Sequence, residues 1–186
     1  SHFLCAASDK ERFSQLKSAM FAKDSSVVWC VRGGYGMGRI MPEIMKLKRP
    51  TRTKLVIGLS DISLLHLFVT QKWNWPALHG PLLDRFGGNR ITSEVKQQVE
   101  DLLFGRVHQV KYSHLQPLNS AAKKKGSVRG VVTGTNLTML DNSLHTKWQL
   151  QAQGKILVLE DIDERGFRVD RMLGHLQNSG VLNKTK

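Results

Sequence analysis

The stretch that decides the fold runs from Leu55 to Val69 and reads LVIGLSDISLLHLFV. Its first five residues, 55–59, are apolar without alternation, which is typical of a strand covered on both faces. The polar pair Ser60-Asp61 interrupts the apolar run, and residues 62–69 then suit a largely buried helix. A buried strand that turns directly into a helix is the repeating unit of a parallel α/β sheet.

The same pattern continues on both sides of this stretch. A capping box at Ser8–Glu11 predicts a helix, and the apolar run 27–31 predicts a strand that leads into a Gly-rich turn. Further strands are expected at 128–132 and 156–159, and further helices at 93–104, 136–144 and 167–177. Helix and strand alternate throughout, which predicts an α/β fold. We expect a Rossmann- or flavodoxin-like parallel sheet domain (1–108), a basic linker (109–126) and part of a smaller α/β domain of the swivelling β/β/α type (127–186).

Composition excludes several classes of protein. The chain has 186 residues, of which 40% are hydrophobic, too many for a disordered tail or a collagen-like fibre. Two cysteines, Cys5 and Cys30, cannot form a disulfide framework, which favours a reducing compartment, and Cys30 is expected to be a buried thiol. No apolar run approaches the roughly 20 residues that span a bilayer, and residues 1–4 lack the build of a secretory signal. We therefore expect no membrane partner.

The charge is strongly basic, with 28 Lys and Arg against 15 Asp and Glu, a net charge of +13. Two acid-free stretches, 46–54 with five bases and 109–126 with four, supply nine of these charges. Both stretches contain Pro or Gly punctuation, which predicts loops. Aromatic side chains that could stack on bases do not interleave with them. The pattern favours solvated loops over a nucleic-acid surface, and no nucleic-acid partner is expected.

Two predicted strand-to-helix turns could carry chemistry, because ligands of parallel sheets bind beyond the carboxyl ends of the strands. Gly33, Gly34 and Gly36 form the first turn, where backbone N–H groups can approach an anion closely. A dinucleotide fingerprint is not met, since Arg39 stands where its third Gly belongs. A plain tight turn is the alternative interpretation.

Ser60 lies at the second turn, which has the layout of a nucleophile elbow. The pattern G-x-S-x-G is not met, because Ile62 replaces its second Gly, and Ser60 or Asp61 could instead be an ordinary helix N-cap. Glu160 follows the predicted strand 156–159 and could orient a histidine. The seven histidines form no metal-binding pattern, so neither a metal nor a cofactor is expected.

These segments together resemble the LD-carboxypeptidase family of serine peptidases. Six stretches match in the family's order and cover nearly the whole chain: WCVRGGYG at 29–36 with Arg39 and Pro42, IGLSDI at 57–62, HGP at 79–81, GTNL at 134–137, VLED at 158–161 and RVDRML at 168–173. Departures are Thr135, where a second Gly is usual, and Phe167, where Tyr is common. The resemblance implies that the family's first strand and helix precede Ser1.

The resemblance implies a cytoplasmic enzyme of peptidoglycan recycling that releases the terminal D-alanine from murein tetrapeptides. It places Ser60 on the nucleophile and Glu160 on the acid of a Ser-His-Glu triad whose histidine lies outside these 186 residues. His79 is the local histidine that could replace it. For the oxyanion, we expect backbone N–H groups of Asp61 and of Gly33 or Gly34. For the carboxylates of the substrate, a rim containing Arg32, Tyr35 and Arg39 is expected.

Two alternatives remain open on the residues. One is a microcin-immunity-type peptidase of the same family, which cleaves an acylated nucleotide toxin and needs an aromatic residue against the base. The other is a catalytically inactive, basic binding module with salt-sensitive nucleic-acid binding. The resemblance further implies a homodimer.

Overall fold

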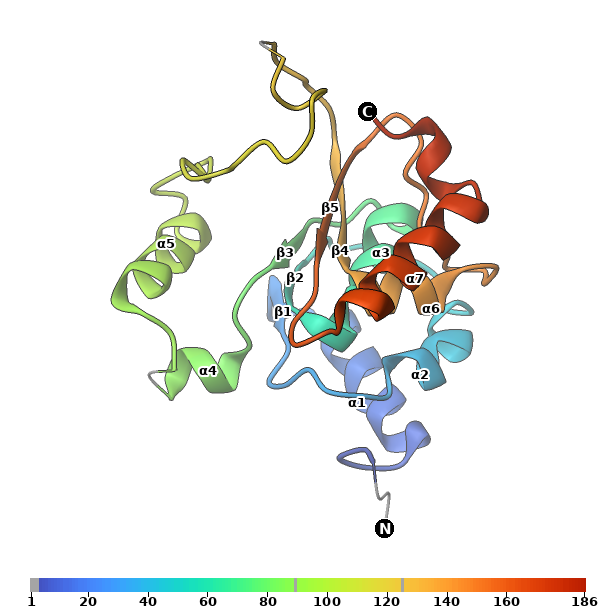
Figure 1. Cartoon of the computed structure of the whole chain (residues 1–186). Helices are drawn as coiled ribbons and strands as arrows, with labels where there is room; N and C mark the ends of the chain where they lie inside the picture. The colour runs from blue at the N-terminus through green and yellow to red at the C-terminus, as the bar shows by residue number, and fades with distance from the viewer. Residues whose placement is uncertain (1–3, 89, 125) are drawn as a thin grey trace.

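The computed structural model describes residues 4–88, 90–124 and 126–186 (Figure 1). Its first sheet contains β1 (Val27–Trp29), β2 (Leu55–Gly58) and β3 (Ala77–His79) in the order β1-β2-β3. Both pairings are parallel, and Gly58 is the register partner of His79. The carboxyl ends of β2 and β3 therefore lie side by side, and the residues that follow them share one edge of the sheet.

Three helices share one hydrophobic core with this sheet. They are α1 (Asp9–Phe21), α2 (Met37–Ile44) and α3 (Ser63–Lys72), and a short 3-10 turn η1 (Ser60–Ile62) joins β2 to α3. Helix α1 begins with the predicted capping box, in which the Ser8 hydroxyl accepts from the Glu11 amide at 3.1 Å. Helix α3 is buried from Ser63 to Val69, as the apolar sequence predicts. Its central position explains why Leu55–Val69 decides the fold.

Helices α4 (Leu83–Gly87) and α5 (Ser93–Leu103) lie to one side of this body (Figure 1). The start of α4 is tied to the end of β1, since Leu83 N–H donates to the Cys30 carbonyl at 3.0 Å. Phe86 packs edge-on against Trp29, with ring centroids 4.8 Å apart. The loop after β1 is thus held between the sheet and α4.

A second sheet pairs β4 (Val132–Asn136) with β5 (Ile156–Glu160) in parallel, and α6 (Leu137–Ser143), α7 (Gly166–Asn178) and a 3-10 turn η2 (Val181–Lys184) accompany it. The prediction of a strand at 128–132 is wrong. Pairing with Ile156 begins only at Val132, and Val128 and Val131 are exposed. An apolar run without a partner strand does not form a ladder.

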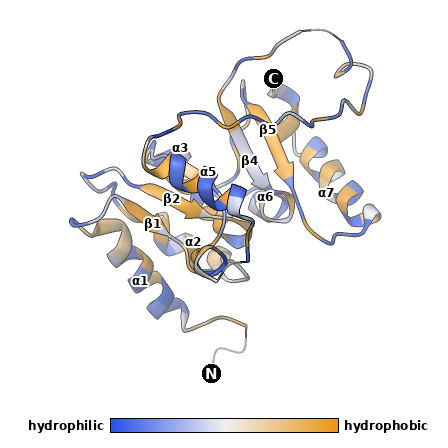
Figure 2. Cartoon of the chain, turned by 90° about the vertical axis from the view of Figure 1, so that its left-hand side faces the viewer, coloured by the Kyte–Doolittle hydropathy of each residue, from blue (hydrophilic) through white to orange (hydrophobic). Residues whose placement is uncertain are grey.

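The two sheets belong to one body, because α3 contacts both α6 and β4. The predicted α/β fold with parallel strands is confirmed. Burial on both faces holds for β2 alone, since Val27 in β1 is 37% exposed and Val158 in β5 is 50% exposed. Figure 2 shows β1, β2 and β5 as mainly hydrophobic ribbons. Within the described residues, no helix is long and apolar enough to cross a membrane.

Two of the five bases in the stretch 46–54 donate to backbone carbonyl groups, and only Lys54 is buried. Lys54 is 1% exposed, and its ammonium donates to the Ala19 carbonyl at 2.7 Å and to the Ser25 hydroxyl at 2.8 Å. Arg52 donates to the carbonyl of Lys23. The other basic stretch contains no helix or strand in its described part, and Lys125 lies outside the described residues.

Candidate active site

Ser60 lies on a strained turn directly after β2. Its backbone φ is 62°, in the left-handed region that non-glycine residues seldom occupy. The turn requires Gly58, because a Cβ there would lie 2.8 Å from Cγ2 of Ile62. Sharp backbone geometry of this kind lifts a serine hydroxyl beyond the end of a sheet, as a nucleophile requires.

The glycine turn after β1 reaches this serine. An ideal Cβ on Gly33 would lie 3.2 Å from both the Ser60 Cβ and the Leu59 carbonyl oxygen, so the Gly33 backbone packs against the serine turn. Gly34 and Gly36 have φ values of 106° and 122°, which favour glycine. The structure therefore brings Gly33 and Ser60 together, and places Gly34 next along the chain.

Asp61 holds the two turns together. Its buried carboxylate accepts a hydrogen bond of 2.7 Å from the backbone N–H of Met37, the first residue of α2. Burial raises the pKa of Asp61, while the N–H groups of Met37 and Gly36 and the charge of Arg12 oppose this. Asp61 thus caps α2, whose own N-cap, Gly36, has no side chain to do so.

Glu160, at the carboxyl end of β5, lies beside His79 at the end of β3. The Glu160 Oε1 to His79 Nε2 distance is 3.5 Å. On its other side, His79 Nδ1 is 2.7 Å from the Thr135 hydroxyl, which is 2.9 Å from the Ser63 hydroxyl. Because His79 pairs with Gly58, two residues before Ser60, the predicted acid reaches the strand edge that carries the predicted nucleophile.

The predicted binding residues lie around the glycine turn. Arg39 pairs with Asp9 at 2.9 Å, and Arg32 pairs with Asp84 at 3.2 Å, while their side chains stay 53% and 73% exposed. Asp9 chiefly, and then the Tyr35 side chain, raise the pKa of Arg39. Tyr35 and Arg39 therefore adjoin one another, and Arg32 projects toward α4.

Other polar groups in this region have structural roles. Asp161 accepts hydrogen bonds from the backbone N–H and the hydroxyl of Thr138 and so caps α6. Burial raises the pKa of the Cys30 thiol to about 11, which makes it a poor nucleophile at neutral pH. No group of three or more metal-ligating side chains occurs among the described residues.

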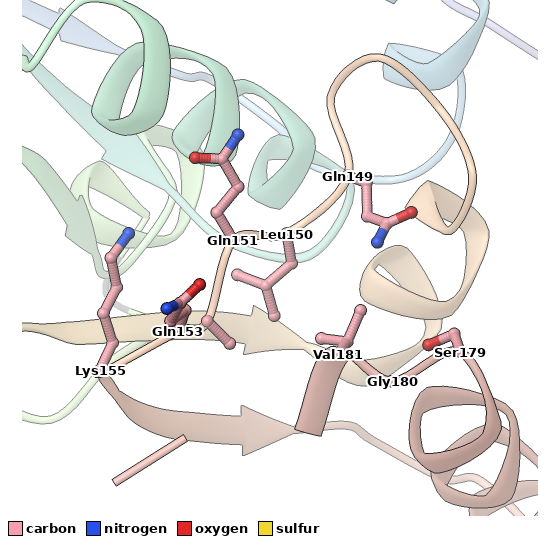
Figure 3. Close-up of a pocket in the computed structure, with 9 residues that line it drawn as sticks. Gln149, Leu150, Gln151, Gln153, Lys155, Ser179, Gly180 and Val181 are labelled. Carbon is pink, nitrogen blue, oxygen red and sulfur yellow. The ribbon is translucent and has the colours of Figure 1, made fainter. Parts of the chain in front are cut away.

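A cavity of about 660 Å³ lies elsewhere, between the loop before β5 and the end of α7 (Figure 3). Its lining includes Gln149, Gln151, Lys155 and Ser179. None of the predicted site residues lines it, so it is a separate feature from the serine turn.

The comparisons with known proteins agree with this geometry. The family model of the LD-carboxypeptidase N-terminal domain matches residues 1–80, and that of the LD-carboxypeptidase C-terminal domain matches residues 129–186. The chain belongs to the LD-carboxypeptidase family. The resemblance inferred from the six sequence stretches is thereby confirmed.

Individual relatives cover nearly the whole chain. The murein tetrapeptide carboxypeptidase of Pseudomonas aeruginosa is 34% identical over 184 residues, which are 94% of this chain and 58% of that protein. A relative from Rickettsia conorii is 42% identical over 185 residues, 97% of this chain and 58% of its own length. The chain thus spans a little under three fifths of the curated relatives it matches.

Solved structures share the fold. The muramoyltetrapeptide carboxypeptidase of Oxalobacter formigenes superposes with a TM-score of 0.80 at 29% identity, covering 100% of this chain and 62% of that one. The microcin C7 self-immunity protein MccF, solved with aspartyl sulfamoyl adenosine, gives a TM-score of 0.74 at 19% identity, covering 100% of this chain and 63% of its own. The likeness to MccF concerns the fold alone.

Proposed function

We propose that this chain carries the nucleophile and the acid of a serine carboxypeptidase that releases the terminal D-alanine from murein tetrapeptides during peptidoglycan recycling. The observation that carries the proposal is the left-handed turn at Ser60, beyond the central strand, with Gly33 packed against it. The names of the relatives from Pseudomonas aeruginosa and Oxalobacter formigenes support the substrate class.

The reaction is acyl transfer in two steps. The Ser60 hydroxyl attacks the carbonyl carbon before D-alanine, and a histidine accepts the hydroxyl proton. The tetrahedral intermediate collapses, the C–N bond breaks, and the histidine returns the proton to the amine of the departing D-alanine. Water then hydrolyses the ester on Ser60, and Glu160 stabilises the imidazolium in both steps. The family resemblance implies that this histidine lies outside these 186 residues.

Backbone N–H groups supply the oxyanion hole in this proposal. The amide of Asp61 follows the nucleophile directly, and the packing of Gly33 against Ser60 supports a second donor from Gly33 or Gly34. One such donor is worth roughly 3 to 4 kcal/mol of transition-state stabilisation. The hydrogen bond from the Met37 N–H to the Asp61 carboxylate holds the serine turn and the glycine turn in a fixed relative position.

Recognition of the substrate rests on charge. A murein stem peptide carries several carboxylates, and Arg32, Tyr35 and Arg39 border the glycine turn. Both arginines remain substantially exposed despite their ion pairs, so each can exchange an aspartate partner for a substrate carboxylate.

The test is D-alanine release from a murein tetrapeptide by the protein in its full natural length. Ser60→Ala should lower kcat by at least about a thousandfold without lowering the melting temperature. Ser93→Ala, at an exposed serine of α5, is the matched control and should leave kcat unchanged. Retained hydrolysis in Ser60→Ala would overturn the assignment. Faster cleavage of an aminoacyl-nucleotide analogue than of the tetrapeptide would overturn the substrate class.

We further propose a cytoplasmic location and a homodimeric assembly, both of which rest on the family resemblance. Light scattering on the purified full-length protein tests the assembly. A mass twice that of one chain supports the dimer, and the mass of a single chain contradicts it.

A further inference from the structure

A polar bridge joins the two sheets beside the serine turn. It consists of the side chains of Ser63 in α3, Thr135 in β4, His79 in β3 and Glu160 in β5. Ser63 and Thr135 are 0% and 5% exposed, whereas the His79 and Glu160 side chains are 38% and 40% exposed. The bridge therefore leads from the buried start of the helix that follows Ser60 to the accessible carboxylate of the predicted acid.

The chemistry of the groups gives the bridge a direction. The negative charge of Glu160 favours a proton on the nearer ring nitrogen of His79, Nε2. A neutral ring protonated there leaves Nδ1 as an acceptor, to which the Thr135 hydroxyl donates. Thr135 can in turn accept from Ser63. The Ser63 hydroxyl thus orients the Thr135 hydroxyl, which in turn orients the His79 ring. The Nε2–H of that ring then points toward the Glu160 carboxylate.

The backbone of Thr135 indicates that its side chain is held for a reason. Its φ of 146° lies in a region that favours glycine, and a β-branched residue is strained there. The preceding residue, Gly134, must itself be a glycine, because a Cβ there would lie 2.0 Å from the Val158 carbonyl oxygen. From this strained position the Thr135 hydroxyl contacts both Ser63 and His79.

We propose that His79 is a positioning residue for Glu160. Its ring is held in place by the hydroxyl groups of Thr135 and Ser63, and it thereby fixes the position of Glu160, on the second sheet, relative to the helix that follows Ser60. The contact uses Oε1 of Glu160, and a carboxylate has a second oxygen with which it can orient the imidazole of the base. The inference rests on the proposed function, since it assigns a role to the acid of that reaction.

The titratable groups that face His79 are Glu160 from β5 and His66 from α3, whose ring centroid is 6.4 Å away. His66 is buried and neutral near neutral pH, because burial, and then His79, lower its pKa to about 4. Burial lowers the pKa of His79 as well, and the charge of Glu160 opposes this. Glu160 is therefore the one of these two groups whose charge acts on His79 near neutral pH.

A pair of variants in the full-length protein separates the two contacts of His79. His79→Gln extends an amide toward the Nε2 position, whereas His79→Asn keeps an amide near the Nδ1 position. If His79 acts on Glu160, Asn should lower kcat by about ten- to a hundredfold with KM little changed, and Gln should retain most of kcat. The opposite order, equal losses in both, or no loss in either overturns the proposal. His175→Ala removes the 2.7 Å contact between Nδ1 of His175 and Asp141, a second His-carboxylate pair, and is the control that should leave kcat unchanged.

A second measurement does not depend on activity or on the folding of the His79 variants. NMR titration of the isotope-labelled histidines should give a lower pKa for His79 in Glu160→Gln than in the wild type, because a negative charge is lost. If the pKa of His79 is the same in Glu160→Gln as in the wild type, His79 and Glu160 do not interact and the proposal is overturned. Ser60→Ala separates the two hypotheses: if it retains hydrolysis, the proposed function fails, while the titration still decides whether His79 and Glu160 interact.

Discussion

Asp61 offers the sharpest test of how the serine turn is built. Asp61 is 7% exposed and its carboxylate accepts the Met37 N–H at 2.7 Å, so Asp61→Ala leaves a buried backbone donor without its partner. An orphaned buried N–H costs roughly 1 to 3 kcal/mol, and we expect the free energy of unfolding to fall by that amount. Asp61→Asn keeps an oxygen that can accept the same bond.

The asparagine variant should behave differently for a physical reason. It forgoes a charge-assisted hydrogen bond, but it also removes the cost of burying a charge, which is the cause of the raised pKa of Asp61. The two effects oppose each other, and we expect Asp61→Asn to stay within about 1 kcal/mol of the wild type.

Urea unfolding followed by circular dichroism measures both variants. With a slope near 2 kcal/mol per M, the alanine variant should shift its midpoint by about 0.5 to 1.5 M, and the asparagine variant by clearly less. A wild-type midpoint for alanine, or equal losses in the two variants, would refute the capping role of Asp61.

Three further predictions concern strain and burial. Ser60→Gly should be more stable than Ser60→Ala by about 1 kcal/mol, since only glycine relaxes a φ of 62°; equal melting temperatures would contradict the strain. His66 keeps its ring neutral down to about pH 4, whereas the unfolded chain binds a proton from about 6.5, so stability falls as pH drops through that window. The loss should reach about 3 kcal/mol and largely vanish in His66→Phe, and an unchanged acid slope in urea midpoints would count against it. Gly134→Ala should cost about 3 kcal/mol or more, because its Cβ would lie 2.0 Å from the Val158 carbonyl oxygen. Gly174→Ala, with open space around its Cβ, is the control and should not destabilise.

The serine turn could be predicted because its determinants are local. An apolar run, Ser60-Asp61 and a second apolar run follow one another in sequence, and each element is recognised from its own residues. The alternative interpretation, in which Ser60 or Asp61 is the N-cap of the helix that follows, is wrong, because α3 has Ile62 as its N-cap and no side-chain cap. Asp61 caps a different helix. The capped helix is α2, 24 residues earlier in the chain, and no local pattern shows such a partner.

The role of His79 could not be predicted for the same reason. A histidine at the end of a predicted extended segment is visible in the sequence, but its partners are Thr135 and Glu160, which belong to the other sheet. Which strand ends meet depends on how α3 packs against α6 and β4, and pairing patterns within one strand carry no such information. The error at 128–132 has a related cause, because β-propensity without a partner does not make a strand.

The most direct test of Ser60 as the nucleophile is to treat the full-length protein with a fluorophosphonate and locate the adduct by peptide mass spectrometry. A nucleophilic serine forms a bond to phosphorus and expels fluoride, so the probe reports the activated hydroxyl. We predict a single adduct on Ser60, which disappears in Ser60→Ala and persists in Ser93→Ala. An adduct on a different serine, or D-alanine release by a protein in which Ser60 is never labelled, would contradict the assignment of Ser60 as the nucleophile.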